Sequence, residues 1–442
     1  MASDEVRLAP APEDSYRLYI LTSLVLAVFL GFALGLHTAV SRITGGGDPE
    51  RSADLLQAHG QVQLLGFAGL YVMGMSFRLL PRFAGSRLAH PSLLTPIVVL
   101  IAAGLVPRAI VLPFLTGSAH DALLLFSAAA VVAANIAFAL VIFETARRGR
   151  ERDAAALAFV GGALFSLAAS LVFLLEAVDA TSDGLRTIPL LSQNAVLQLE
   201  LDGFVLLFIT GVSFRAIPTM VGIDRPEPRQ AALLVGGLIV AVGLLSASLL
   251  YLEHVTYSES GARVVSASYA VFGLVLLGVS WTSGAVRSAG NRLRPASQPH
   301  LWLVRSAFAW MAVAGALAVY AGASGLIDGA IPGQFEFDAV RHSLGLGVIT
   351  NLIAGMSLMI VPEFAAQRQH TTQRGLALTL VVLINAATLL RVAPAIAGTA
   401  WSYDLRNLSM AGAGTLAEVA VMLFAVSLIR LVRTPAAIRR SA

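Results

Sequence analysis

Two histidines stand out in this chain because each one leads into an apolar stretch of similar pattern. His59 precedes the segment Gly60–Pro81, and His342 precedes Ser343–Pro362. A neutral imidazole is a good ligand for heme iron and for copper. Two such side chains on different helices, at similar depth in a membrane, can hold one heme between them. The alternative is that each histidine marks the membrane interface and caps its helix.

A third stretch of the same pattern carries carboxylates instead of a histidine. Glu200 and Asp202 lie in the segment that leads from Gln198 to Pro218. Ionisable side chains are costly inside a membrane and usually face the interior of a helix bundle. We expect Glu200 and Asp202 to take part in a proton path, to help hold a second metal such as copper, or to pair with an arginine.

Two arginines fall within apolar spans rather than between them. Arg108 and Arg391 come at nearly equivalent places in the first and third parts of the chain. The propionates of a heme near the outer face of a membrane need cationic partners, so both arginines are candidates for that role. The alternative is that they pair with acids such as Glu176 or Glu418.

The three stretches form a threefold internal repeat. Aligned without gaps from Gln61, the first and second copies agree at 10 of 21 positions, and the first and third agree at 6. The spacings from Gly74 to Gly211 and on to Gly355 are 137 and 144 residues. The recurring glycines suggest close approach of backbones, or of a flat ligand. We expect one membrane domain built from three repeats, at residues 1–150, 151–296 and 297–442.

The composition is that of an integral membrane protein. The chain has 442 residues, of which 57% are hydrophobic and 13% charged, whereas soluble domains have roughly 25% charged residues. Apolar runs of about 20 residues recur, and each is long enough to cross a bilayer as a helix. The absence of cysteine excludes disulfides, thiolate metal sites and a cysteine nucleophile. The net charge of +4 does not indicate nucleic-acid binding, because the arginines sit between the apolar runs.

The hydropathy pattern predicts an all-α fold of twelve membrane spans surrounded by lipid. The predicted ranges are 17–37, 59–80, 93–115, 121–143, 154–177, 196–217, 231–252, 264–286, 302–326, 342–361, 375–396 and 410–432. The side that holds both termini has 22 arginines and the opposite side has six. This bias predicts a multi-pass protein of the plasma (inner) membrane with both termini in the cytoplasm. His59 and His342 would then lie near the outer face.

The helix that carries His59 resembles the second helix of heme-copper oxidase subunit I. In that family a His-Gly pair, matched here by His59-Gly60, carries a heme axial ligand near the outer face. The tenth helix of that family also supplies histidine ligands, and His342 opens the tenth span here. That subunit has twelve spans in three sets of four with approximate threefold symmetry. The resemblance therefore implies a heme-copper oxidase subunit I-like fold over the whole chain.

The sequence is more similar still to the NnrS family, membrane proteins of a related fold that bind heme and copper and are linked to nitric oxide metabolism. A His-x-His motif followed by Gly-Phe resembles His59-Gly60-Gln61 through Gly66-Phe67. An Arg-x-Ile-Pro element resembles Arg215-Ala216-Ile217-Pro218, and a lone histidine on helix ten resembles His342. This resemblance implies heme b as cofactor and copper as a second candidate. It also implies nitric oxide or another small gas as ligand, and a quinol or other redox partner.

Some positions depart from these families. Gln61 stands where the second histidine of His-x-His would be, and His254 is alone near helix seven, where an oxidase has paired copper ligands. We therefore do not expect an oxygen-reducing centre of the oxidase type, and whether the protein is an enzyme stays open. The expected function is a membrane protein that binds heme, or heme and copper, in the nitric oxide response or in detoxification.

Two alternative functions remain on sequence grounds. The first is a secondary transporter, because twelve spans with both termini in the cytoplasm is also an arrangement of secondary transporters. Most such folds show two repeats, so three repeats of four spans argue against it. The second is a metal-free, oxidase-like accessory subunit, which Gln61 and the missing helix-seven histidines favour.

Overall fold

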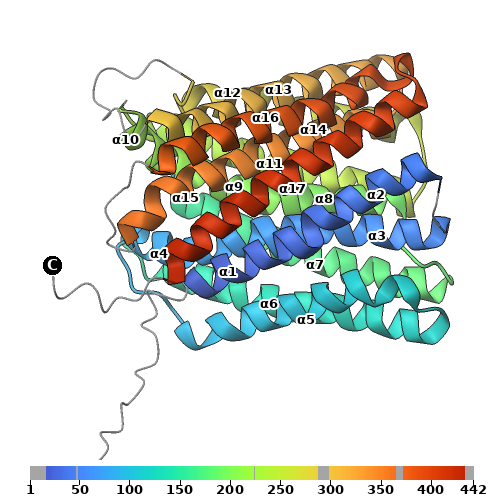
Figure 1. Ribbon diagram of the computed structural model, residues 1–442, viewed down its shortest axis with the longest axis horizontal. Coiled ribbons are helices and arrows are strands. Elements are labelled where there is room, and N and C mark those ends of the chain that lie inside the picture. The colour runs from blue at the N-terminus through green and yellow to red at the C-terminus, as the bar shows by residue number, and fades with distance from the viewer. Residues whose placement is uncertain (1–15, 46–47, 223, 287–297, 365–371, 434–442) are drawn as a thin grey trace, which may run out of the picture.

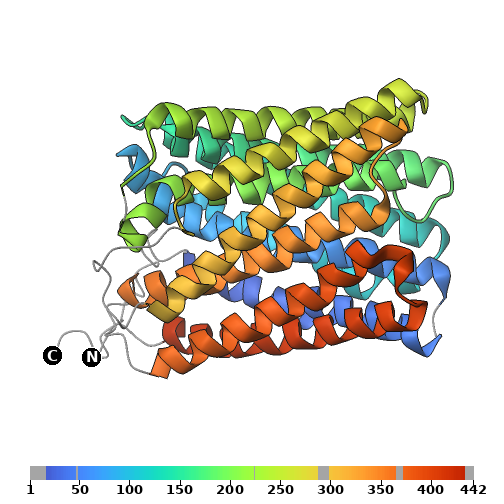
Figure 2. The same ribbon diagram turned by 90° about the horizontal axis from the view of Figure 1, so that it is seen from above.

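The computed structural model describes residues 16–45, 48–222, 224–286, 298–364 and 372–433. In this part of the chain, twelve helices are long and apolar enough to cross a membrane, which confirms the number predicted from the sequence. The helices run side by side in one elongated bundle (Figures 1 and 2). The bundle end at which α1 begins and α17 ends is called the terminal end below, and the opposite end is called the distal end.

The first four spans begin with two helices that are each interrupted by a π-helical turn. In chain order the elements are α1 (Tyr16–Leu26), η2 (Ala27–Phe32) and α2 (Ala33–Thr44); α3 (Pro49–Gln61), η3 (Val62–Gly69) and α4 (Leu70–Ala84); η4 (Pro91–Leu93), α5 (Leu94–Ile110) and η5 (Leu112–Phe114); and α6 (Gly117–Arg147). The carboxylate of Asp48 caps α3 by accepting from the Glu50 backbone N–H at 3.0 Å, and Pro49 occupies the first turn. These residues set the start of α3.

In the next four spans the second helix is again interrupted by a π-helical turn. They are α7 (Ala154–Ser182); α8 (Leu190–Gln198), η6 (Leu199–Val205) and α9 (Leu206–Arg215), followed by the short α10 (Ile217–Val221); α11 (Pro228–His254); and α12 (Glu259–Thr282). Asp153 caps α7 by accepting from the Ala156 N–H at 3.0 Å, and its other oxygen accepts from Arg215 at 2.5 Å. This carboxylate therefore ties the start of α7 to the end of α9.

The last four spans repeat the arrangement once more. They are α13 (Gln298–Asp328); α14 (Gln334–His342), η8 (Ser343–Thr350) and α15 (Asn351–Phe364); α16 (Thr372–Ala397) with η9 (Gly398–Ala400); and α17 (Tyr403–Arg433). α17 also packs against α2, which brings the last span beside the first.

The second, sixth and tenth spans form the centre of the bundle. In their most apolar stretches 72%, 89% and 72% of the residues are buried, against 33–61% in the other nine spans of the described chain. Each of the three contains a π-helical turn, and η3 packs against both η6 and η8. π-helical turns are rare and often occur at functional sites. Three of the four π-helical turns of the described chain therefore lie in its most enclosed part, and the fourth, η2, lies in the first span.

Glycines let each central helix approach the first helix of its own set. A Cβ added at Gly74 would lie 2.5 Å from the Tyr19 Cβ, and one at Gly211 would lie 2.8 Å from the Ala158 Cβ. At Gly355 the added atom would lie 3.0 Å from the Leu303 Cβ. The close approach expected from the glycine pattern is thus present at all three positions, while the threefold repeat itself stays a prediction.

The helix bounds differ from the expected ones at both ends of the central helices. α3 and α14 begin about two turns or more before His59 and His342, so neither histidine opens its helix. The span predicted to end at residue 80 continues as α4 to Ala84 and stops where Gly85 adopts a φ of 63°. A proline in a last turn removes only one hydrogen bond, whereas a left-handed glycine redirects the chain.

Candidate functional site

His59 is held against the first span by a hydrogen bond and by a close fit. Its Nδ1 donates to the carbonyl oxygen of Gly31 in η2 at 2.8 Å. Its ring lies over Gly35 in α2, where an added Cβ would stand only 2.6 Å from the His59 Cε1. Both glycines therefore fix the ring, one through its carbonyl and the other through its missing side chain.

His342 is held by an acid on its own helix and, through it, by an arginine on α16. Its Nδ1 donates to the carbonyl oxygen of Asp338 at 2.9 Å and lies 3.1 Å from the Asp338 Oδ1. The same carboxylate accepts from the Arg391 Nη1 at 2.6 Å and from the Nη2 at 3.0 Å. A bidentate arginine–carboxylate pair is geometrically specific. It fixes the carboxylate that in turn orients the imidazole.

The structure brings these two histidines together at the distal half of the bundle. His59, His342, Asp338 and Arg391 are close enough for their charges to interact. Within the described residues, neither histidine has a hydrogen bond at Nε2. A ring whose Nδ1–H is held by an oxygen presents Nε2 in a defined direction, which is the usual arrangement of a metal-ligating histidine. Each of the two histidines therefore presents an Nε2 atom in a direction fixed by its Nδ1 bond.

Gly345, three residues after His342, has open space beside it. A Cβ added there would meet no atom within 4 Å. The two imidazole nitrogens form a donor set that fits a group ligated by imidazole, as a heme is.

Glu200 is buried in η6 and faces an arginine of the first set of spans. Its side chain is 3% exposed, and its Oε2 is buried without a hydrogen-bond partner in the described residues. Arg108 is close enough to interact with the Glu200 charge, donates to the Gln61 Oε1 at 2.6 Å and lies 4.0 Å over the Phe173 ring. Gln61, which replaces a histidine of the family motif, thus holds Arg108 next to Glu200.

Asp202 faces a different arginine, on the opposite side of the same turn. It is 1% exposed, and its Oδ1 is also buried without a partner in the described part of the chain. Arg341 and Tyr269 lie within electrostatic reach of it, and Arg341 donates to the Asn194 Oδ1 at 2.9 Å. Glu200 and Asp202 therefore point to different neighbours.

In the described residues no third side chain completes a metal site with Glu200 and Asp202. Across residues 16–45, 48–222, 224–286, 298–364 and 372–433, no group of three or more histidine, aspartate or glutamate side chains is arranged to hold a metal ion. In the described residues neither Arg108 nor Arg391 forms an ion pair with Glu176 or Glu418, and Arg391 pairs with Asp338. Instead Glu176 bonds to His254 at 2.6 Å. Copper binding by Glu200 and Asp202 stays a prediction.

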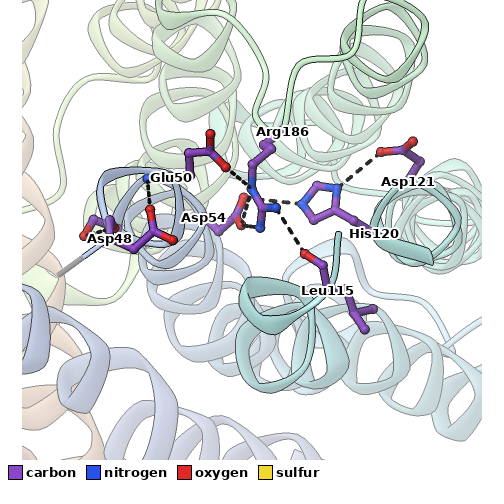
Figure 3. Close-up of polar contacts among 8 residues, drawn as sticks. Asp48, Glu50, Asp54, Leu115, His120, Asp121 and Arg186 are labelled. Atoms are coloured by element: carbon purple, nitrogen blue, oxygen red, sulfur yellow. Dashed lines mark hydrogen bonds and ion pairs between the residues drawn. The ribbon is translucent and has the colours of Figure 1, made fainter. Parts of the chain in front are cut away.

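A second polar cluster lies at the distal end and ties α3 to the loops around it (Figure 3). The buried Asp54 carboxylate accepts from the Arg186 Nη2 at 2.5 Å and from the Nε at 3.2 Å, and the Arg186 Nη1 donates to the Leu115 carbonyl at 3.1 Å. His120 stands between two acids, with Nε2 3.5 Å from Asp54 and Nδ1 3.3 Å from Asp121. Because Asp54 precedes His59 by five residues, this cluster fixes the segment of α3 that carries the histidine.

We expect an Arg186→Ala variant to be less stable by about 3 kcal/mol, because it leaves the buried Asp54 carboxylate without its cation. The measurement is thermal unfolding in detergent. The control is Arg263→Ala, which breaks an exposed pair with Glu259 and is expected to cost less than about 1 kcal/mol. Equal unfolding temperatures for the two variants would contradict the role of Arg186.

Sequence reasoning missed several residues of these sites. Asp338 precedes His342 by one helical turn, so an acid-histidine spacing of four on one helix was the available signal. Asp54 and Arg186 are 132 residues apart, and nothing local in the sequence pairs them. Arg341 lies just outside the predicted span 342–361, and nothing local in the sequence places it near Asp202.

The fold defines the class of protein to which the chain belongs. It superposes on a chain from the structure entitled "Cryo-EM structure of a heme-copper terminal oxidase dimer provides insights into its catalytic mechanism" with a TM-score of 0.70. The match covers 97% of this chain and 85% of that chain, at 11% sequence identity. At 11% sequence identity the similarity shows a shared fold and nothing further. The chain is a multi-pass, all-helical membrane protein with a heme-copper oxidase-like fold.

The family follows from the sequence. A family model described as NnrS protein matches residues 16–435, nearly the whole chain, so the chain belongs to the NnrS family. This confirms the family inferred from the motifs at His59, Arg215 and His342. A comparison with curated proteins finds no match.

Proposed function

We propose that this protein binds heme b between His59 and His342. The observation that carries the proposal is the pairing of these residues, each with Nδ1 bonded to a backbone carbonyl oxygen and Nε2 without a partner among the described residues. Membership of the NnrS family and the oxidase-like fold support it. A bound heme would supply an iron centre capable of one-electron chemistry.

The residues around the pair would orient the ligands and balance charge. Gly31 and Gly35 hold the His59 ring, and Asp338 with Arg391 holds the His342 ring. Arg391 is only 19% exposed and lies near both histidines, which makes it the better candidate for a propionate partner. Arg108, bonded to Gln61 beside Glu200, is the second candidate.

We further propose that the protein acts in the response to nitric oxide or in its detoxification. The reason is the family to which the chain belongs together with a histidine pair suited to heme. Copper is a second candidate cofactor, with Glu200 and Asp202 as acids that could contribute to its site. The arginine distribution supports an orientation in the plasma membrane with both termini in the cytoplasm and the histidine pair toward the outer face.

The test is an absorption spectrum with metal analysis on detergent-purified protein from heme-replete cells. We expect a red protein with a Soret band that shifts on reduction and again on exposure to nitric oxide. A colourless protein without iron would refute the proposal and favour a metal-free accessory subunit. Uptake of a solute into proteoliposomes that needs no metal would favour a transporter instead.

A further inference from the structure

Four polar side chains, Asn194, Arg341, Tyr269 and Asp202, lie at increasing depth below the distal end of the bundle and are called the polar row. They belong to the sixth, eighth and tenth spans, which start at the distal end because the first span starts at the terminal end. From the first residue of α8, Asn194 lies about 6 Å and Asp202 about 18 Å along the chain axis. Arg341 lies about 10 Å into α14, and Tyr269 about 15 Å into α12.

Asp202 and Arg341 lie near each other without touching. Each is within electrostatic reach of the other, and Tyr269 is within reach of both. In the described chain, however, no hydrogen bond or ion pair joins them, and the Arg341 Nη2 donates instead to the Asn194 Oδ1 at 2.9 Å. Opposite charges attract strongly in a protein interior. A gap between them therefore calls for polar material that bridges it.

Three members of the polar row each bury a polar atom that has no hydrogen-bond partner in the described residues. These atoms are the Asn194 Nδ2, the Asp202 Oδ1 and the Tyr269 hydroxyl. All three side chains are no more than 1% exposed. Leaving a buried polar group unpaired costs roughly 1–3 kcal/mol, and the large majority of such groups in proteins are paired with protein or with ordered water. Three unpaired atoms in one row therefore indicate a missing partner common to them.

Water is the partner that suits this set of groups. The Asn194 amide and the Arg341 guanidinium donate, the Asp202 carboxylate accepts, and the Tyr269 hydroxyl does both. A buried water makes two to four hydrogen bonds of both kinds. A metal cation would be repelled by Arg341, and an anion by Asp202. Arg341 is also the one member of the polar row that is partly exposed, so it connects the buried atoms with solvent on the distal side.

We propose that ordered water molecules occupy the space between Asp202, Tyr269 and Arg341 and continue past Asn194 to the distal face. They supply the hydrogen bonds that the three buried atoms lack, and they bridge the carboxylate to the guanidinium. The polar row is then a hydrated route from the distal face into the bundle. It brings water beside Arg341, the chain neighbour of His342, and it does not require a bound heme.

The test is X-ray footprinting of the full-length protein in detergent. The beam produces hydroxyl radicals from water, including ordered internal water, and mass spectrometry measures the oxidation of side chains beside it. We expect Tyr269 to be oxidised at least tenfold faster than Tyr19. Both tyrosines are 0% exposed, but the Tyr19 hydroxyl donates to the Leu94 carbonyl at 2.6 Å and needs no water. Equal oxidation rates for the two tyrosines would overturn the proposal.

The variant Asn194→Leu places an apolar side chain in the route and is expected to slow Tyr269 oxidation at least fivefold. Its matched control is Asn135→Leu, which removes a buried amide that accepts from the Ser166 hydroxyl at 2.7 Å and lies outside the polar row. The control should leave the Tyr269 rate unchanged, and an unchanged rate in Asn194→Leu would contradict the route.

A high-resolution cryo-EM map of the unaltered protein gives a second measurement that needs no variant. We expect water density within hydrogen-bond distance of the Asp202 Oδ1 and the Tyr269 hydroxyl. A metal ion there, or no density at all, would overturn the proposal. Heme content, measured on the same preparations, reports on the histidine pair alone, so failure of the heme proposal is distinguishable from failure of this one.

Discussion

A protein carrying both His59→Ala and His342→Ala is expected to be purified without heme and without a Soret band. Each substitution removes an imidazole whose Nε2 is free while its Nδ1 is bonded to a carbonyl oxygen, at 2.8 Å from Gly31 and 2.9 Å from Asp338. Alanine offers no ligand, and among the described residues no histidine other than His342 interacts with His59. The measurement is heme per protein, from the pyridine hemochrome spectrum, at equal protein concentration.

The single variants separate the two ways in which the pair could act. If both side chains ligate one iron, each single variant should lose most of its heme, or should keep a heme whose reduced spectrum has changed from six-coordinate to five-coordinate. His37→Ala is the matched control, because His37 is an exposed histidine on α2. Wild-type heme content in the double variant would contradict the proposed ligands. A variant that aggregates on size exclusion would be replaced by His59→Gln with His342→Gln, which keep polarity and bulk.

The number and the nature of the spans were predictable because they depend on composition alone. A run of about 20 apolar residues is costly anywhere but in a membrane or a protein core. The helix starts were not predictable in this way. α3 begins at Pro49, ten residues before His59, because Asp48 caps it. Those ten residues are helical but polar on balance, so hydropathy places the start of the span too late.

The candidate site was predictable only in part. His59 and His342 were identifiable from their positions in the repeated segment, and Glu200 and Asp202 from being acids in an apolar stretch. Their partners were not identifiable from the sequence. Arg108 and Gln61, for example, are 47 residues apart, and their contact depends on how α3 and α5 pack in space. The π-helical turns were also invisible, since they change the hydrogen-bond pattern without changing the residue types.

Gly35 gives a sharper test of how the heme would be held, because it contributes no chemical group. We expect Gly35→Ala to reduce heme content about tenfold, the lower end of what loss of a supporting contact around a metal ligand costs. The added Cβ would stand 2.6 Å from the His59 Cε1 and 3.1 Å from the Nδ1. The ring must then move, which breaks the 2.8 Å bond to the Gly31 carbonyl that sets the direction of Nε2.

The matched control is Gly236→Ala in α11, where an added Cβ would meet no atom within 4 Å. Alanine is favoured over glycine within a helix by about 0.5–1 kcal/mol, so this variant should keep its heme and unfold at the same or a higher temperature. The Gly35→Ala protein gains the same helix propensity, so a loss of heme without a loss of stability would point to the displaced ring. Unchanged heme in Gly35→Ala would mean that α2 moves aside instead, and that the close fit at Gly35 does not set the position of His59.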